Sequence, residues 1–194
     1  MPRNEIIRCA WCGTDPIYIR YHDEEWGVPV HDDRRLFEML ILDGMQAGLS
    51  WITVLKKRGE FRKAFDHFDP QRIAQYDEEK VSQLMDNPGI IRNRLKIQGA
   101  IKNAQAFLEI QKEFGTFDQF IWSFVGNKPR QNRFTNAKQI PARTPESDRM
   151  SKELKKRGFS FAGSTICYAF MQAAGMVNDH VAGCFRYLDV KRGK

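Results

Sequence analysis

Apolar residues recur at helical spacing along most of this chain. The segment 36–45, LFEMLILDGM, places its apolar side chains three and four positions apart, so that they share one face of a helix. Asp32 or Asp33 is placed to cap the start of this helix. A second helical segment opens at Ser50, which can serve as its cap, and stops at Gly59. No stretch shows the sustained alternation of apolar and polar residues that half-buried strands need. The pattern therefore predicts an all-α fold.

The rest of the chain continues the helical pattern and carries one long loop. Asp69 followed by Pro70 opens another helix, because an acidic cap and a proline in the first turn both favour a helix start. A loop is expected over about 127–145, where three of the eight prolines lie. No repeat or low-complexity tract divides the sequence, so we expect one domain, or two small lobes that share a core. Further helical segments are expected over 79–85, 92–115, 117–126, 147–158 and 163–175.

The charge balance favours an acidic partner without identifying one. The chain has 31 Lys and Arg against 24 Asp and Glu, a formal net charge of +7, which suits a polyanion such as nucleic acid. Its first residues lack the apolar core of a signal peptide, and no apolar run approaches the ~18–20 residues of a membrane span. We therefore expect a soluble, cytoplasmic protein, in which the four cysteines serve metal binding or chemistry before disulfides.

Cysteine and histidine gather at the two ends of the chain in a pattern typical of metal sites. His180 and Cys184 stand four residues apart, a spacing that brings both onto one ion. Two further ligands would come from the stretch CAWCGTDPIYIRYHDEEWG and the residues just after it, where the candidates are Cys9, Cys12, His22 and His31. Spacing alone favours the C-x-x-C pair, Cys9 with Cys12, and hence a Cys₃His site. The alternative is that Cys12 is a buried thiol and His31 a solvated loop residue.

Four longer stretches resemble the bacterial 3-methyladenine DNA glycosylase I family: YHDEEWGVP, AGLSWITVLKKR, GIIRNRLKIQ and LKKRGFSFAGSTICYAFMQAAGMVNDHV. The resemblance runs over about residues 9–184 and keeps these motifs in order. It implies the architecture of a helix-hairpin-helix DNA glycosylase, a single domain over residues 1–194 with a pocket between two helical lobes. It also implies an enzyme of base-excision repair. Such an enzyme hydrolyses the N-glycosidic bond of a flipped, cationic alkylated adenine in double-stranded DNA, without a lyase step.

The resemblance implies a different set of metal ligands from the one that spacing favours. The family's structural zinc is held by an N-terminal cysteine, the histidine of Y-H-D, the histidine of N-D-H and a cysteine four residues later. In this chain these positions are Cys9, His22, His180 and Cys184. Cys12 has no role in that set. Four protein ligands leave no open position for water, so such a Zn²⁺ ion would be structural and would join the N- and C-terminal segments.

Aromatic residues near the N-terminal end suit either a binding pocket or a core. Tyr18 and Tyr21 stand three apart and share a face if their segment is helical. The resemblance implies that Trp51 and Tyr21 stack on the flipped base, while Trp11 and Tyr18 complete the wall of the pocket. Because a base methylated at N3 is cationic, electron-rich aromatic faces attract it more strongly than they attract normal adenine. The alternative is that these rings only fill a core.

A carboxylate is the expected polar partner of a cationic base. The family has a glutamate on the helix before the Q-A-G-L-S-W motif, and this chain has Asp43 there. We assign Asp43 the catalytic role, because it keeps the charge although its side chain is one methylene shorter. Glu38 lies five residues earlier, and a rotation of about 140° points its side chain elsewhere. The alternative is that Asp43 is a solvated residue at a helix end.

Contacts to DNA are expected at two turns. In the hairpin LMDNPGIIRNRLKIQ, a sharp turn precedes a helix whose first backbone N–H groups can bind a phosphate, with Arg94 and Lys96 nearby. Just before the pocket tryptophan, a Gly-Leu pair resembles the family's probe that fills the gap left by the flipped nucleotide. The expected DNA contacts are Gly89, Ile90, Ile91 and Arg92 in the hairpin, and Gly48 and Leu49 before the tryptophan.

Two functions of different class are compatible with the sequence. The first is a monofunctional 3-methyladenine glycosylase. The second is a zinc-stapled protein that recognises alkylation damage without excising the base, which the replacement of the family's glutamate by Asp43 keeps open. Release of free base separates the two. In either case we expect a monomer in the bacterial cytoplasm, nucleoid-associated when it acts on DNA, with no membrane attachment and no obligatory protein partner.

Overall fold

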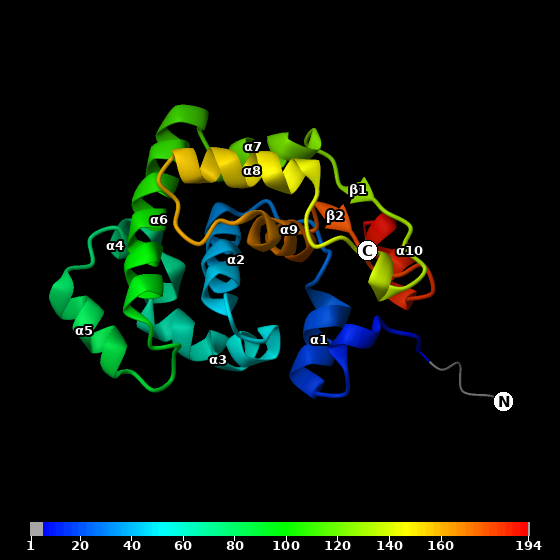
Figure 1. Ribbon diagram of the computed structural model, residues 1–194, viewed down its shortest axis with the longest axis horizontal. Helices are drawn as coiled ribbons and strands as arrows, with labels where there is room; N and C mark the ends of the chain where they lie inside the picture. The colour runs from blue at the N-terminus through cyan, green and yellow to red at the C-terminus, as the bar shows by residue number, and fades with distance from the viewer. Residues whose placement is uncertain (1–5, 194) are drawn as a thin grey trace.

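Helices surround one central helix, α2, in the computed structural model, which describes residues 6–193 (Figure 1). The helices are α1 (Pro16–Glu24), α2 (Asp33–Gln46), α3 (Trp51–Ala64), α4 (Pro70–Ile73), α5 (Glu78–Asp86), α6 (Arg94–Phe114), α7 (Phe117–Trp122), α8 (Pro145–Lys156), α9 (Ser164–Ala173) and α10 (Phe185–Lys191). Four 3₁₀ turns and two short strands complete the description: η1 (Ala10–Cys12), η2 (Asp66–Phe68), η3 (Ser123–Val125), η4 (Ala137–Gln139), β1 (Arg130–Gln131) and β2 (Val177–Asn178).

Short polar side chains fix most of the helix starts. Asp32 caps α2 by accepting a hydrogen bond from the backbone N–H of Arg35 (2.9 Å). Asp69 caps α4 in the same way, with a proline in the first turn. Both starts confirm the predictions from sequence. Ser50 does precede α3, but its hydroxyl pairs with the hydroxyl of Thr53 (2.7 Å) and not with the helix backbone.

Two details of the predicted fold are wrong. Helix α3 continues through Gly59, because the cost of a helical glycine, about 1 kcal/mol, is offset when the next turn buries Phe61. The expected loop over 127–145 contains η4 and strand β1, which pairs in parallel with β2, Arg130 opposite Val177. These two-residue strands are the only sheet in the described part of the chain. The all-α prediction is therefore confirmed for the class of the fold and corrected for this small sheet.

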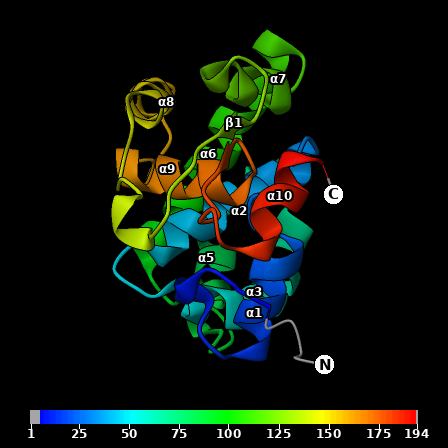
Figure 2. The ribbon, with the colours of Figure 1, turned by 90° about the vertical axis from the view of Figure 1, so that its right-hand side faces the viewer.

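Helix α2 is the centre of the main core. It packs against α3, α6, α7 and α9, and in Figures 1 and 2 these helices lie around it. Its almost completely buried side chains include Leu36, Phe37, Leu40, Ile41 and Met45. Burial of a large apolar side chain contributes about 1.5–3 kcal/mol. This packing fixes the direction of α2, and with it the side chains of its last turn.

A second, smaller cluster of buried side chains lies where the two ends of the chain meet. It contains Cys9, Tyr21, Trp26, Leu55, Ala173 and Cys184. The partly buried side chains of Met39 and Trp51 pack against both this cluster and the main core. That the two clusters correspond to two lobes of a single domain stays a prediction.

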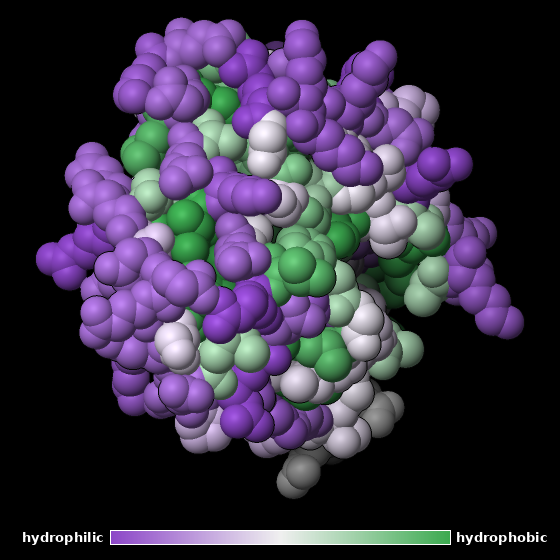
Figure 3. Space-filling model, turned by 60° about the vertical axis from the view of Figure 1, so that its left-hand side comes forward, coloured by the Kyte–Doolittle hydropathy of each residue, from purple (hydrophilic) through white to green (hydrophobic). Residues whose placement is uncertain are grey.

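The surface is mostly hydrophilic on the face that Figure 3 shows, with apolar side chains in small patches between polar ones. Within residues 6–193, no helix has both the length and the apolar character that crossing a membrane requires.

Gly175 should be the least replaceable glycine next to the pocket helix α9. Its φ is +69°, and an added Cβ would lie 2.4 Å from the backbone of Val28 and Pro29. We expect Gly175→Ala to lower the free energy of unfolding by about 2–4 kcal/mol, because left-handed strain and a backbone clash add. Gly158→Ala is the matched control. The φ of Gly158 is +93°, but nothing lies within 4 Å of the added Cβ, so this substitution should lower the free energy of unfolding by only about 1 kcal/mol. Urea unfolding measures both losses, and equal losses would contradict the clash.

Candidate functional site

The predicted pocket residues surround one cavity of about 330 Å³. Its lining consists of Trp11, Tyr18, Tyr21, Trp26, Asp43, Gln46, Trp51, Ala137, Ile140, Ala169, Gln172 and Ala173. The structure therefore brings together all four aromatic residues expected at the base, and Asp43 with them. A larger hollow of about 790 Å³ lies along α4 and α6 but contains none of the predicted site residues. Size alone does not identify the site.

The aromatic side chains form one continuous wall. Tyr18 and Tyr21 lie on successive turns of α1, Trp51 opens α3, and Trp11 lies in η1. The ring centroids of Tyr21 and Trp51 are 5.4 Å apart at an angle of 50°, and those of Trp11 and Tyr18 are 5.0 Å apart. A ring inserted between two others needs about 7 Å, twice the contact distance of carbon atoms. Trp51 and Tyr21 therefore touch each other and offer adjoining surfaces to a ligand.

Three polar atoms of this wall lack partners. The indole N–H groups of Trp11 and Trp51 and the Oδ2 atom of Asp43 have no hydrogen-bond partner among the described residues. Asp43 lies in the last turn of α2 and is only 4% exposed, so the alternative of a solvated helix-end residue is wrong. Burial raises the pKa of Asp43 well above its ordinary value. Burial also raises the pKa of Tyr21, and the charge of Asp43 adds to that rise.

A second hollow, of about 200 Å³, shares Asp43 in its lining with this cavity. Its lining includes Gly48 and Leu49, which follow the end of α2. Gly48 has φ of +77°, a conformation that suits glycine, and the turn leaves the Leu49 side chain 43% exposed. The turn that resembles the family's probe therefore presents an apolar side chain to solvent beside the cavity.

Sequence reasoning missed three polar or aromatic residues of the cavity. Trp26 lies in the aromatic-rich N-terminal stretch, and its closeness to the other rings was the available signal. Gln46 follows Asp43 by three residues on α2, and Gln172 follows Ala169 by three residues on α9, so each shares a helix face with another lining residue. Nothing in the spacing of these glutamines marks them in the sequence itself.

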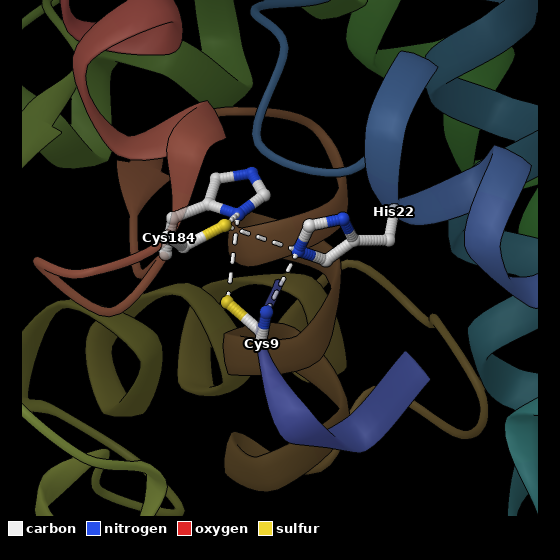
Figure 4. Close-up of side chains that lie close together, drawn as sticks. Cys9, His22 and Cys184 are labelled. Carbon is white, nitrogen blue, oxygen red and sulfur yellow. Dashed lines mark hydrogen bonds between the residues drawn. The ribbon is translucent and has the colours of Figure 1, made fainter. Parts of the chain in front are cut away.

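Four metal-ligating side chains from opposite ends of the chain meet in one cluster. The ligand atoms of Cys9, His22, His180 and Cys184 all lie within 4.8 Å of one another, and all four residues are buried. The Cys184 sulfur is 3.4 Å from Nε2 of His22 and 3.6 Å from Nδ1 of His180. Figure 4 shows Cys9, His22 and Cys184 pointing toward one another from different segments. This arrangement can hold a metal ion.

The atoms around the cluster prepare these nitrogens for coordination. Nδ1 of His22 lies 2.7 Å from a carboxylate oxygen of Asp23, and Nε2 of His180 lies 3.0 Å from the carbonyl oxygen of Trp26. A ring N–H that donates to each oxygen leaves the other nitrogen unprotonated and facing the cluster. A hydrogen bond from the Cys9 thiol lowers the pKa of the Cys184 thiol, which favours a thiolate there.

The ligand set that spacing alone favours is wrong for this structure. Cys12 lies outside the cluster, and its buried thiol donates to the carbonyl oxygen of Cys9 (3.1 Å). His31 lies 2.8 Å from Asp118 and stacks on Trp122. Cys12 is therefore a neighbour of Cys9 and not its co-ligand, and His31 lies away from the cluster.

The expected DNA hairpin is formed by α5, a turn and α6. In the turn, the backbone N–H of Gly89 donates to the side chain of Asn87 (2.8 Å), and that of Ile90 donates to the Asn87 carbonyl (3.4 Å). Helix α6 begins at Arg94 with Asn93 as its cap, so the N–H groups of Ile90 and Ile91 precede the helix and do not open it. Arg92 is exposed. The contacts of these residues with DNA stay a prediction.

Lys96 occupies a different place from the one expected beside a phosphate. Its ammonium is buried and donates to the carbonyl oxygens of Met45 (2.8 Å) and Ala47 (2.6 Å), at the C-terminal end of α2. Burial lowers its pKa. A cation at this position satisfies carbonyl groups that the helix leaves without partners and opposes the negative end of the helix dipole. Lys96 therefore ties the hairpin to the helix that carries Asp43.

The fold and the cavity define a helical protein with an aromatic, carboxylate-bearing pocket beside a helical hairpin, as expected of proteins that bind an extruded base. The sequence profile described as methyladenine glycosylase matches residues 11–187. This chain belongs to that family.

Relatives and solved structures agree with this assignment. DNA-3-methyladenine glycosylase 1 of Escherichia coli (strain K12) is 54% identical over 180 residues, which are 93% of this chain and 96% of the relative. DNA-3-methyladenine glycosylase of Haemophilus influenzae is 50% identical over 177 residues, 91% of this chain and 96% of the relative. A crystal structure of 3-methyladenine DNA glycosylase I matches with a TM-score of 0.91 at 56% identity, over 92% of this chain and 98% of that one. A structure of 3-methyladenine DNA glycosylase I from Staphylococcus aureus, solved for the structural basis of 3-methyladenine recognition, matches with a TM-score of 0.90 at 36% identity. The match covers 92% of this chain and 95% of that one.

Replacement of Asp43 by asparagine should stabilise the free protein at neutral pH. Because burial raises the pKa of Asp43, folding is opposed wherever the unfolded chain ionises this group, that is, above its ordinary pKa of 3.8. We expect Asp43→Asn to raise the free energy of unfolding by about 1 kcal/mol or more at pH 7. The gain should vanish as the pH falls below about 4, where both states hold the proton.

Urea unfolding of wild type and variant at neutral and acidic pH measures this difference. Asp118→Asn, at a partly exposed aspartate that pairs with His31, is the control and should give no gain. A gain of equal size at both pH values would contradict the cost of the buried charge.

Proposed function

We propose that this chain is a DNA glycosylase that removes 3-methyladenine from double-stranded DNA. One observation carries the proposal: the cavity walled by aromatic rings contains a buried carboxylate, Asp43, with an oxygen that lacks a hydrogen-bond partner among residues 6–193. A buried carboxylate without a partner favours a ligand that is a cation and a hydrogen-bond donor. A 3-methylated adenine in DNA is both, and the relatives named above are enzymes for that base.

The size of the cavity supports a single extruded base as the ligand. A volume of about 330 Å³ lies at the lower end of the range for ligand pockets, about 300–1,000 Å³. A duplex does not enter such a cavity, so the base must leave the stack and turn into it. The exposed side chain of Leu49 would fill the gap, and the hairpin over Gly89–Arg92 would hold the flanking phosphates.

The charge of the base decides what the enzyme must do. Hydrolysis passes the electrons of the N-glycosidic bond to the base, which leaves neutral, adds water to C1′ of the sugar, and releases one proton. The base needs no protonation, so the barrier lies in the positive charge that develops on the sugar. Asp43, ionised when the cationic base arrives, would stabilise that charge from the wall of the cavity. Because its side chain is shorter than glutamate, a water molecule can bridge it to the base.

The lysines near the pocket in sequence support hydrolysis without a lysine nucleophile. Lys56 forms an ion pair with Asp15 (2.7 Å), and Lys57 donates to the carbonyl oxygen of Pro88 (2.8 Å). A lyase reaction would need a free amine at the sugar. This arrangement favours a monofunctional enzyme.

The cluster of Cys9, His22, His180 and Cys184 fits a structural Zn²⁺ ion. Tetrahedral zinc with sulfur at about 2.3 Å and nitrogen at about 2.0 Å requires ligand atoms about 3.5 Å apart. The nitrogen–sulfur distances of 3.4 and 3.6 Å agree with that requirement. Two thiols and two imidazoles are a preferred donor set for zinc. When bound, the ion would act as a crosslink between the ends of the chain and take no part in the reaction.

The first prediction from this proposed function concerns base release. We expect the purified protein to release 3-methyladenine from methylated duplex DNA, and Asp43→Asn to slow that release by about 100-fold, because the buried charge is lost. Asp43→Glu restores the residue typical of the family and should stay within about tenfold of wild type. Chromatography of the released bases gives the rates.

Asp118→Asn is again the matched control and should excise at the wild-type rate. Full activity of Asp43→Asn would remove the proposed role of Asp43. Tight binding to methylated DNA without any release of base would instead identify a protein that recognises damage without excising it.

The second prediction concerns the metal. We expect about one zinc ion per chain, and we expect Cys184→Ser to lose it. The crosslink closes a loop of about 175 residues and should contribute about 4–5 kcal/mol, so its loss lowers the melting temperature by about 10 °C. Cys12→Ser, beside the cluster but outside it, should keep the ion. Elemental analysis and thermal unfolding measure both variants, and zinc retained by Cys184→Ser would contradict the assignment.

A further inference from the structure

We infer that Gln172 is a specificity-determining residue, whose side-chain carbonyl oxygen accepts a hydrogen bond from the exocyclic amine of the flipped base. This inference rests on the proposed function and extends it, because it explains how the cavity would distinguish a 6-amino purine from a 6-oxo purine. Charge alone cannot distinguish the two kinds of purine, because guanine methylated at N3 or N7 is cationic too.

The position of Gln172 brings its side chain to the same cavity as Asp43. Gln172 lies on α9, one turn after Ala169, and both residues line the cavity together with Ala173. Its backbone is held as well, because its carbonyl oxygen accepts a hydrogen bond from the backbone N–H of Gly27 (3.1 Å). Asp43 and Gln172 therefore offer two polar side chains to one ligand, from two helices that pack against each other.

A buried carboxylate fixes the orientation of the Gln172 amide. Asp179 is completely buried, and its Oδ2 atom accepts hydrogen bonds from Nε2 of Gln172 (2.8 Å) and from the hydroxyl of Tyr168 (2.7 Å). Its Oδ1 atom accepts from Nδ2 of Asn132 (2.7 Å). A carboxylate that receives three donors can only accept, so the NH₂ group of Gln172, and not its oxygen, must face Asp179. The Oε1 atom is then the polar atom left for the cavity.

An acceptor fixed in this way selects for an amine. The 6-amino group of adenine has two N–H bonds, one for Asp43 and one for Gln172. Guanine has an oxygen at the same position, which would face two acceptor oxygens and leave them without donors from the base. Sites that hydrogen-bond a particular group of the substrate reject analogues without it much more strongly than apolar pockets do.

The test uses duplex DNA treated with a methylating agent, which contains 3-methyladenine, 3-methylguanine and 7-methylguanine. We expect Gln172→Met, which keeps the length of the side chain but removes the acceptor, to lower the ratio of released 3-methyladenine to released methylguanines by about tenfold or more. Tyr168→Phe is the matched control. It removes another donor to Asp179 and leaves the Gln172 amide bound, so the ratio should stay at the wild-type value.

A purely structural role of Gln172 gives a different result. If the residue only supported Asp179, Gln172→Met would slow the release of all three bases equally and keep their ratio, and this outcome overturns the inference. Should the variant not fold, Asp43→Ala decides, because Gln172 is then the acceptor left for the 6-amino group: this protein is titrated with free 3-methyladenine and free 3-methylhypoxanthine, followed by tryptophan fluorescence. We expect the 6-oxo base to bind at least about tenfold more weakly, and equal binding overturns the inference. Wild-type protein that releases no base would refute the proposed function, while the binding comparison would still decide on Gln172.

Discussion

The aromatic wall depends on the contact between the two ends of the chain. Trp11 follows Cys9 by two residues and Tyr21 directly precedes His22, so the two N-terminal members of the cluster carry wall residues with them. The ring of His180 binds the carbonyl oxygen of Trp26, a third member of the wall. An arrangement that fixes the ends of the chain therefore also fixes the surface on which a base would stack. Loss of the cluster would loosen the pocket before it affected any reacting group.

A buried carboxylate without partners is a local instability that the rest of the fold must offset. Asp43 lies on α2, which packs against four other helices, and the apolar face of α2 contributes far more than one buried acid costs. Most proteins pair such a group or replace it. A buried acid without a partner in an aromatic cavity is typical of binding sites. Such a site lowers the stability of the free protein, and the ligand then supplies the partner that the acid lacks.

The sequence predicts the local parts of this structure and misses the contacts between distant parts. Asp32 and Asp69 predict where their helices start, because capping depends only on neighbouring residues. Spacing alone pairs Cys9 with Cys12, since it cannot show that the chain returns His180 and Cys184 to the same place. The ligand set, the pocket rings and Asp43 were predictable only through resemblance to a family. The contacts of Lys96 and Gln172 were not predicted, because they are made with carbonyl groups and a carboxylate that the fold brings from distant parts of the chain.

Lys96 shows why the hairpin and the pocket must be considered together. Lys96, in the first turn of α6, donates to the carbonyl oxygens of Met45 and Ala47, which lie in the chain between Asp43 and the exposed Leu49. The hairpin therefore cannot shift along its axis without disturbing the turn that borders the pocket. A phosphate held by the hairpin would be held at a fixed distance from the carboxylate. DNA held by the hairpin as proposed would present one nucleotide to the cavity, so the hydrogen bonds of Lys96 would link the proposed hold on the DNA backbone to the pocket that receives the base.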